Sequence, residues 1–227
     1  MLLDHSNFSV YKPLEAAKLI GISSQRIKRW ISGYNYKSDG KIKTQPPLWN
    51  RKYSEFEDCY LGFQDLIEIR FVEAFVRAGL SPHAVRKLLN KARDIVDSEY
   101  PLSTHQFKTD GKTIFLEVWE TDDAKAIDVR SGQHAFHSII RPSFRDLEFN
   151  ENTVTKWYVA GRNKKLEIDP DKAFGQPVIE NTSIPTARLF EAFQAEGNAK
   201  SVARQFEISL AAVRHAIEFE TKMASHH

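Results

Sequence analysis

The spacing of apolar residues near the start of the chain predicts a short helix that ends in a tight turn. Leu14, Ala17 and Ile20 supply the apolar positions of this helix. Pro13 can open it, because the N–H that proline lacks would have no partner in a first turn. Gly21 then supplies the turn, so a second helix is expected directly afterwards.

The second helix has one apolar face and one face rich in hydrogen-bond donors. Ser23 is placed to cap it, and Ile27, Trp30 and Ile31 give it a buried stripe. The side chains left on its outer face are Ser24, Gln25, Arg26, Lys28 and Arg29. A helix needs such donors to contact base edges and phosphates in the major groove of DNA. We therefore predict a helix-turn-helix whose second helix recognises DNA.

The distribution of charge supports this prediction. The chain as a whole has a formal charge of +2. The stretch from Lys12 to Lys52 holds ten Lys or Arg against Glu15 and Asp39, a net charge of +8, so the remainder carries −6. A cationic segment on an otherwise acidic chain suits a phosphate backbone, although a solvated basic surface would give the same count. The residues expected to contact phosphates are Lys37, Lys41, Lys43, Arg51 and Lys52.

Two longer amphipathic helices are expected next. Apolar residues recur at a helical period over 66–76, and Gly79 ends this helix. Ser81-Pro82 opens the following one as a cap and a first-turn proline. Its basic residues, which we expect on the outer side, are Arg86, Lys87, Lys91 and Arg93. Tyr100-Pro101 stops the helical region.

The middle of the chain is expected to be rich in strands. Residues 107–116 read as two strands around Asp110-Gly111, a dipeptide that favours a tight hairpin turn. Further strands are expected at 136–140, 155–159 and 166–168. Together they predict a small β-rich module.

Helical periodicity returns from Thr186 onwards. Leu189, Phe190 and Phe193 form one apolar face, which Gly197-Asn198 interrupts, and two further helices follow. The proportions are again those of a helix-turn-helix. The outer face of the last helix is poor in donors for DNA: Leu210, Ala211, Ala212, Arg214 and His215. We interpret this unit as one for oligomerisation or partner binding, with a second DNA-binding unit as the alternative.

These elements predict an α+β fold, mainly α, in three parts. A winged helix-turn-helix region is expected over 8–100, a β-rich middle module over 101–165 and a tri-helical domain over 166–224. An apolar content of 41% with 15 Phe suits a packed globular core. No apolar run approaches the roughly 20 residues that span a bilayer. The start of the chain shows no secretory signal, so we expect a cytoplasmic protein without a membrane partner.

No catalytic or metal-binding signature is present. The chain has no phosphate-binding glycine loop, no His-Glu-x-x-His and no nucleophile elbow. Cys59 is the one cysteine, which excludes internal disulfides and a thiolate-rich zinc site. His134 and His137 would lie on opposite sides of a strand, so they are not expected to share a metal. We expect no enzymatic activity and no cofactor.

A series of short motifs covers about residues 11–95. These motifs are Ala16-Ala17-x-x-x-Gly21-Ile22-Ser23, Ile27-Lys28-Arg29-Trp30, Arg51-Lys52-Tyr53-Ser54, Asp65-Leu66 and Arg77-Ala78-Gly79-Leu80-Ser81. In this order they resemble the MerR superfamily of winged helix-turn-helix proteins. The resemblance implies that 33–49 forms the wing and that Arg51 and Tyr53 contact the phosphate backbone. The long dimerising coiled coil and the metal-sensing cysteines of such regulators have no counterpart here, so metal sensing is not expected.

A second set of motifs lies in the C-terminal part. It comprises Asp169-Pro170, Phe174-Gly175-Gln176-Pro177-Val178-Ile179, Ile184-Pro185-Thr186, Glu196-Gly197, Val202-Ala203 and Ile208-Ser209-x-x-x-Val213. This order resembles the short domain of formerly unknown function that is found in VapB-type antitoxins. The segment 181–185 departs from it, with Asn-Thr-Ser-Ile-Pro where many members have Gly-Thr-Arg-Ile-Pro.

The second resemblance implies a type II toxin–antitoxin module. The protein would neutralise a PIN-like ribonuclease toxin encoded by a neighbouring gene and would bind operator DNA to repress its own operon. A homodimer is expected, because two half-sites one helical turn apart raise the affinity of so small a motif. The sequence does not identify the residues that contact the toxin. Four candidate cations lie outside the DNA-binding face: Arg141, Arg145, Arg162 and Arg188.

Two other classes of function fit the sequence. One is a ligand-responsive repressor whose effector site lies in the middle module, lined by aromatic residues that a plain core would also contain: Phe107, Phe115, Trp119, Phe136, Trp157 and Tyr158. The other is a protein-interaction adaptor in which the basic face is idle.

Overall fold

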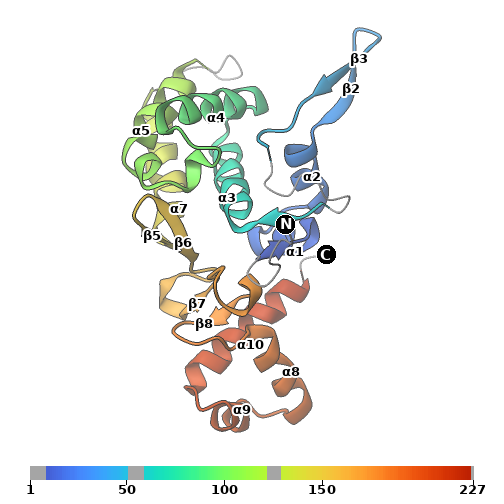
Figure 1. Cartoon of the computed structure of the whole chain (residues 1–227), viewed down its shortest axis with the longest axis vertical. Coiled ribbons are helices and arrows are strands. Elements are labelled where there is room, and N and C mark those ends of the chain that lie inside the picture. Colours follow the sequence, from blue (N-terminus) through green and yellow to red (C-terminus); the bar gives the residue numbers. More distant parts are fainter. Residues whose placement is uncertain (1–8, 51–58, 122–128, 226–227) are drawn as a thin grey trace, which may run out of the picture. The chain divides into compact units, whose positions relative to one another are not determined.

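The computed structural model describes residues 9–50, 59–121 and 129–225, which belong to two compact units (Figure 1). The larger unit comprises 11–145 and 149–154, and the smaller one comprises 1–10, 146–148 and 155–227. Helices dominate the described residues, whose strands form small two-stranded sheets. The expected α+β fold, mainly α, is confirmed.

The first two helices of the larger unit lie where the sequence predicts them. α1 (Pro13–Ile20) and α2 (Ser24–Ser32) are joined by a turn in which Gly21 has a φ of 79°. Glycine adopts this left-handed conformation without a steric penalty. The side chain of Ser23 accepts a hydrogen bond from the Arg26 backbone N–H at 3.3 Å and so caps α2.

A β-hairpin follows α2 directly and projects from its end in Figure 1. β2 (Tyr34–Ser38) and β3 (Lys41–Gln45) are antiparallel, with Tyr34 opposite Gln45 and Ser38 opposite Lys41. The tip turns at Asp39 and Gly40, both with positive φ, as the tightest hairpin turns require.

Two long helices supply much of the core of the larger unit. β4 (Leu61–Gly62) pairs with β1 (Val10–Tyr11) and leads into α3 (Phe63–Ala78). As predicted, Gly79 ends α3 in the left-handed conformation, and Ser81 caps α4 (Pro82–Val96) by accepting from the Ala84 N–H at 3.1 Å. A short 3₁₀ turn, η2 (Pro101–Ser103), follows.

The expected hairpin around Asp110-Gly111 is wrong, because these residues lie inside α5 (His105–Glu120). The buried positions follow a helical spacing rather than an alternation of two: Phe107, Gly111, Ile114, Phe115, Val118 and Trp119. The ring of Phe107 packs edge-on against the rings of Phe71 and Phe75 in α3. Packing against α3 therefore outweighs the local preference of Asp-Gly for a turn.

The strand expected at 136–140 is also wrong. These residues form one turn of π-helix, η3 (Phe136–Ile140), between α6 (Val129–Ala135) and α7 (Arg141–Arg145). Phe136, Ile140 and Phe144 are buried and recur every four residues, which is a helical spacing. The described residues of 105–121 and 129–145 are thus almost entirely helical, and they contain none of the strands expected there.

Strands do occur from residue 147 onwards. β5 (Leu147–Asn150) pairs with β6 (Thr153–Trp157), which confirms most of the strand expected at 155–159. After a 3₁₀ turn, η4 (Arg162–Lys164), β7 (Leu166–Glu167) pairs with β8 (Val178–Ile179). The loop between these two strands contains η5 (Ala173–Gly175).

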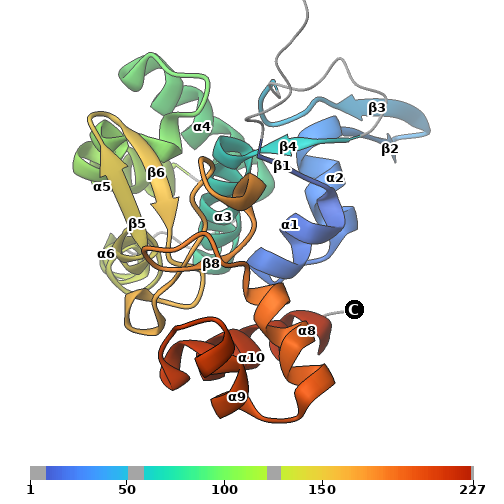
Figure 2. The same cartoon turned by 60° about the horizontal axis from the view of Figure 1, so that its bottom comes forward.

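The C-terminal tri-helical unit is present as predicted. α8 (Thr186–Glu196), α9 (Ala199–Gln205) and α10 (Leu210–Ser225) gather as one bundle in Figure 2. They enclose an apolar cluster that also takes in residues of β7 and β8: Leu166, Ile179, Leu189, Val202, Ala203, Val213 and Ala216. Burial of this cluster joins the short sheet and the helices into one core.

Candidate nucleic-acid interface

Helix α2 presents a polar face to solvent, as the sequence predicts for a recognition helix. Ile27 and Ile31 are buried on its inner side. On its outer side Gln25, Lys28 and Arg29 are exposed, while Ser24 is half-buried. The exposed donors are of the types that contact phosphates and base edges.

Arg26 differs from the other basic residues of α2, because it is turned toward α3. Its Nη2 lies 3.1 Å from Oε2 of Glu73, an ion pair whose geometry falls short of an aligned hydrogen bond. Its guanidinium also stacks over the ring of Trp30 at 5.1 Å. Glu73 is nearly buried and is also paired with Arg77, whose Nε lies 3.0 Å from Oε1. The structure thus gives Arg26 a contact that links α2 to α3.

The hairpin is exposed on both faces. The side chains of Lys37, Lys41 and Lys43 are all exposed, although the Lys43 ammonium donates to the Ser38 hydroxyl at 3.1 Å. Ile42, between two of these lysines, is 71% exposed. The hairpin therefore carries positive charge well outside the core, where a phosphate backbone could contact it. Arg51, Lys52 and Tyr53, the other expected phosphate contacts, lie outside the described residues.

The root of the hairpin is held by two arginines of α4. Arg86 donates from Nη1 to the carbonyl of Pro47 at 2.9 Å and from Nη2 to the carbonyl of Pro46 at 2.7 Å. Arg93 donates from Nη2 to the carbonyl of Leu48 at 2.7 Å. Burial lowers the pKa of Arg86, and the charge of Arg93 adds to this effect. These contacts fix the segment in which the chain leaves β3.

Sequence reasoning missed this role for Arg86 and Arg93, which it placed on the outer side of α4. The available signal was the Pro46-Pro47 pair, since prolines end a strand and leave carbonyls without ladder partners. Two further contacts complete the anchor. The Leu48 N–H donates to the carbonyl of Trp30 at 2.7 Å, and the indole N–H of Trp49 donates to Oδ1 of Asp65 at 2.7 Å in the buried interior.

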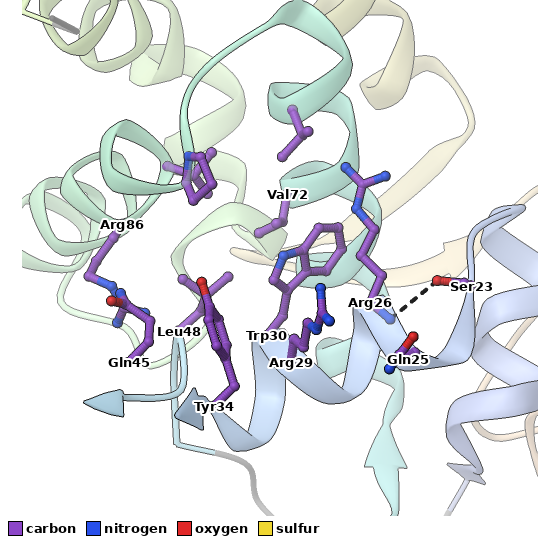
Figure 3. Close-up of a pocket in the computed structure, with 13 residues that line it drawn as sticks. Ser23, Gln25, Arg26, Arg29, Trp30, Tyr34, Gln45, Leu48, Val72 and Arg86 are labelled. Carbon is purple, nitrogen blue, oxygen red and sulfur yellow. Dashed lines mark hydrogen bonds between the residues drawn. The ribbon is translucent and has the colours of Figure 1, made fainter. Parts of the chain in front are cut away.

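A cavity of about 330 Å³ lies between α2, the hairpin root, α3 and α4 (Figure 3). Figure 3 shows the rings of Trp30 and Tyr34 side by side, with Arg86 and Gln45 to one side of them and Arg26 to the other. The three basic residues that line it are Arg26, Arg29 and Arg86, and none of its described lining residues is acidic. Basic side chains therefore continue from α2 toward α4, with Arg26 already paired to Glu73.

The aromatic residues of the alternative effector site belong to the cores. Phe107, Phe115, Trp119 and Phe136 are at most 6% exposed and stack on one another or on α3 in the larger unit. Trp157 and Tyr158 belong to the smaller unit and are also buried. None of the six lines the cavity described above.

Arg162 and Arg188, two of the candidate toxin-contacting cations, make contacts within the chain. Arg162 stacks over the ring of Tyr158 at 4.4 Å and donates to the carbonyl of Leu147 at 2.8 Å, and Arg188 pairs with Glu191 at 3.3 Å. Arg141 and Arg145 are exposed.

His134 and His137 lie on helical turns, not on a strand, and both are exposed. Among the described residues no group of three or more His, Cys, Asp or Glu is arranged to hold a metal ion.

No helix in the part of the chain that the structure describes is both long and apolar enough to cross a membrane.

Comparison with known proteins relates this architecture to other chains. Residues 166–219, from β7 into α10, match a family described as a protein of unknown function (DUF433). The chain is 20% identical over 222 residues, 92% of each sequence, to a Mycobacterium tuberculosis protein named as a candidate antitoxin, VapB45. The crystal structure of Rv2018 from Mycobacterium tuberculosis matches with a TM-score of 0.68 at 16% identity, over 91% of this chain and 96% of that one. The fold is therefore shared along nearly the whole length of both chains.

Proposed function

We propose that this protein is an antitoxin that neutralises a PIN-like ribonuclease encoded beside it and that binds operator DNA to repress its own operon. The observation that carries the proposal is the similarity to VapB45, which extends over 92% of both sequences and so includes both units. The match of 166–219 to the family of unknown function supports it, because this segment is the one whose motifs resemble VapB-type antitoxins.

The DNA-binding part of the proposal rests on α1, α2 and the hairpin of β2 and β3. We infer that they form a winged helix-turn-helix, with α2 in the major groove and the hairpin as the wing. Gln25, Lys28 and Arg29 are exposed on α2, and the exposed lysines of the hairpin supply further positive charge. Phosphate contacts of this kind account for most of the affinity of such proteins and make it dependent on salt.

The proposed protein acts as a cytoplasmic homodimer, without a cofactor and without catalysis of its own. Two copies of α2 spaced by one helical turn would contact the two halves of a palindromic operator. Neutralisation needs only a surface that covers or blocks the ribonuclease, so no reacting group is required of this chain.

The test is co-expression with the PIN-like protein of the neighbouring gene, followed by co-purification and a ribonuclease assay. A stable complex without ribonuclease activity, from a partner that is toxic and active alone, is the expected result. A partner that degrades RNA equally well in the presence of a tenfold excess of this chain would overturn the proposal. Binding of the complex to DNA upstream of the two genes tests the second half separately.

A further inference from the structure

The loop between β7 and β8 holds an unusual backbone. Ala173, Phe174 and Gly175 have φ values of 44°, 56° and 74°, three successive residues in the left-handed region. Residues other than glycine adopt this region at a cost, because the Cβ crowds the carbonyl oxygen. Phe174 is the only aromatic residue among the described non-glycine residues with positive φ. Backbone strain of this kind clusters at functional sites, where the placement of a side chain is worth the loss of folding stability.

The strained backbone places the ring of Phe174 in solvent. Its side chain is 72% exposed, whereas the other large hydrophobic residues described in 155–225 are buried or half-buried. An exposed phenylalanine contributes nothing to the core, so stability does not explain why this residue occupies this position. Glycine would adopt the same backbone without strain.

Ion pairs and backbone hydrogen bonds hold this loop in place. Lys172 lies 2.7 Å from Oε1 of the buried Glu167 and 3.6 Å from Oδ2 of Asp169. Asp169 in turn accepts from the backbone N–H of Asp171 at 3.0 Å. The Gly175 N–H donates to the carbonyl of Lys172 at 2.8 Å, and this closes the turn that carries Phe174. The ring is therefore presented on a fixed support, which lowers the entropy lost on binding.

The charge around the ring indicates the kind of partner. Residues 167–176 carry three carboxylates and the cation Lys172. Glu167 and Asp169 are buried and paired with Lys172, so Asp171 is the exposed carboxylate of the loop. The exposed carboxylate of Asp171 repels a phosphate backbone and attracts a basic protein surface. A ribonuclease has such a surface, because it must attract RNA to its active site.

We propose that Phe174 is an anchor by which this chain binds the PIN-like ribonuclease, with the acidic loop facing the basic rim of the nuclease. This inference rests on the proposed function. Aromatic residues seated in a partner's apolar pocket are typical hot spots of protein interfaces. The segment that matches the family of unknown function, 166–219, includes this loop, so the proposal assigns it a partner-binding role.

The test is the affinity of full-length variants for the purified PIN-like ribonuclease of the neighbouring gene. Phe174→Gly removes the ring and the strain together, so the variant folds with a Tm within a few degrees of the wild type. We expect its Kd to rise at least 30-fold and its ability to inhibit the nuclease to fall accordingly. Ile42→Ala, which truncates a side chain that is 71% exposed on the hairpin, is the matched control and leaves the Kd unchanged.

A second variant tests the charge. Asp171→Lys inverts an exposed carboxylate and is expected to slow association with the nuclease by about tenfold at low salt, with a smaller effect at high salt.

The outcomes separate this inference from the proposed function. If the wild type does not bind the ribonuclease, the proposed function fails. If the wild type binds and Phe174→Gly binds equally well, the antitoxin role stands and the anchor is refuted. If Phe174→Gly instead changes only the oligomeric state of the chain, the ring contacts a second copy, and the proposed partner is wrong.

Discussion

Arg26 and Glu73 form an ion pair, with Nη2 and Oε2 3.1 Å apart, that joins the proposed recognition helix to α3. This contact separates two roles among the basic residues of α2. Arg26 has an internal carboxylate as its counter-charge, whereas Lys28 and Arg29 extend from the exposed side.

Lys28→Ala and Arg29→Ala are expected to weaken operator binding, and each to reduce the slope of log affinity against log salt by about 1. Arg26→Ala is expected to change that slope less, and to lower the free energy of unfolding by about 1 kcal/mol or less, since its side chain is 38% exposed. Binding curves at several salt concentrations distinguish the three variants.

The control for these measurements is Arg188→Ala, which removes an exposed cation of the smaller unit. It should leave the salt slope as it is in the wild type. If both Lys28→Ala and Arg29→Ala keep the salt slope of the wild type, α2 is excluded as the DNA-binding face.

Gly33→Ala is expected to disturb the junction of α2 and the hairpin. A Cβ at this position would lie 2.3 Å from the Gln45 carbonyl oxygen, in addition to the strain of a φ of 70°. Gly40→Ala is the matched control, because its φ of 73° is almost the same but nothing lies within 4 Å of its Cβ. Gly33 also has a ψ of −175°, which puts its backbone in a region essentially restricted to glycine. Its replacement therefore costs more than the penalty of about 1–2 kcal/mol for an ordinary left-handed residue.

Urea unfolding of the two variants therefore measures what the steric contact and the backbone conformation of Gly33 cost together. We expect Gly33→Ala to lose at least about 1 kcal/mol more than Gly40→Ala. Equal losses would mean that the junction relaxes to make room for the methyl group.

Arg86→Met is expected to loosen the hairpin root while keeping most of the side-chain volume. It removes the donors to the carbonyls of Pro46 and Pro47. Because one of these hydrogen bonds is partly buried and the other exposed, each contributes less than the value of about 1.5–3 kcal/mol for a buried hydrogen bond to a charged group. We expect faster proteolysis near the root of the hairpin and weaker operator binding. Lys87→Met, which removes an exposed neighbour on the same helix, should change stability by less than about 0.5 kcal/mol.

Glu68→Gln is expected to alter the dependence of stability on pH. Burial raises the pKa of Glu68 well above its ordinary value, although the carboxyl accepts a hydrogen bond from the Ser103 N–H at 3.0 Å. Because the folded state binds the proton more tightly than the unfolded one, this group lowers stability as pH rises above about 4.5. Glutamine resembles the protonated acid, so the variant loses this contribution and is more stable than the wild type at pH 7.

Chemical denaturation of wild type and Glu68→Gln from pH 4 to pH 8 measures the effect. The difference in unfolding free energy should grow with pH over the lower part of this range. A difference that is constant with pH would show that Glu68 does not titrate there.

Local signals in the sequence predicted the helices of the first hundred residues and of the C-terminal unit. The caps at Ser23 and Ser81 and the glycines at the ends of α1 and α3 act on neighbouring backbone, so they can be recognised without the fold. The exposed face of α2 was predicted on the same basis, because the face of a helix opposite its apolar stripe points to solvent.

The remainder depends on contacts between distant residues. Asp110-Gly111 favours a turn in isolation, but Phe107 packs on α3 and keeps these residues in a helix. Arg86 and the Pro47 carbonyl are 39 residues apart, and Arg26 and Glu73 are 47 apart, so no short pattern shows that they meet. Sequence pattern alone thus identified the basic surface but not the contacts that position it.

The hairpin of β2 and β3 is fixed at its root and exposed on both faces along its length. Its strands contribute little to any core, so residues beyond the root can be exchanged, lengthened or shortened while the helices keep their packing. The hairpin is therefore the part of this unit in which sequence and length can vary most without loss of the fold, much as antibodies diversify their loops on a constant framework. Under the proposed DNA-binding role, grafting a hairpin of another length between Gly33 and Gln45 is expected to alter operator preference while the helices stay folded.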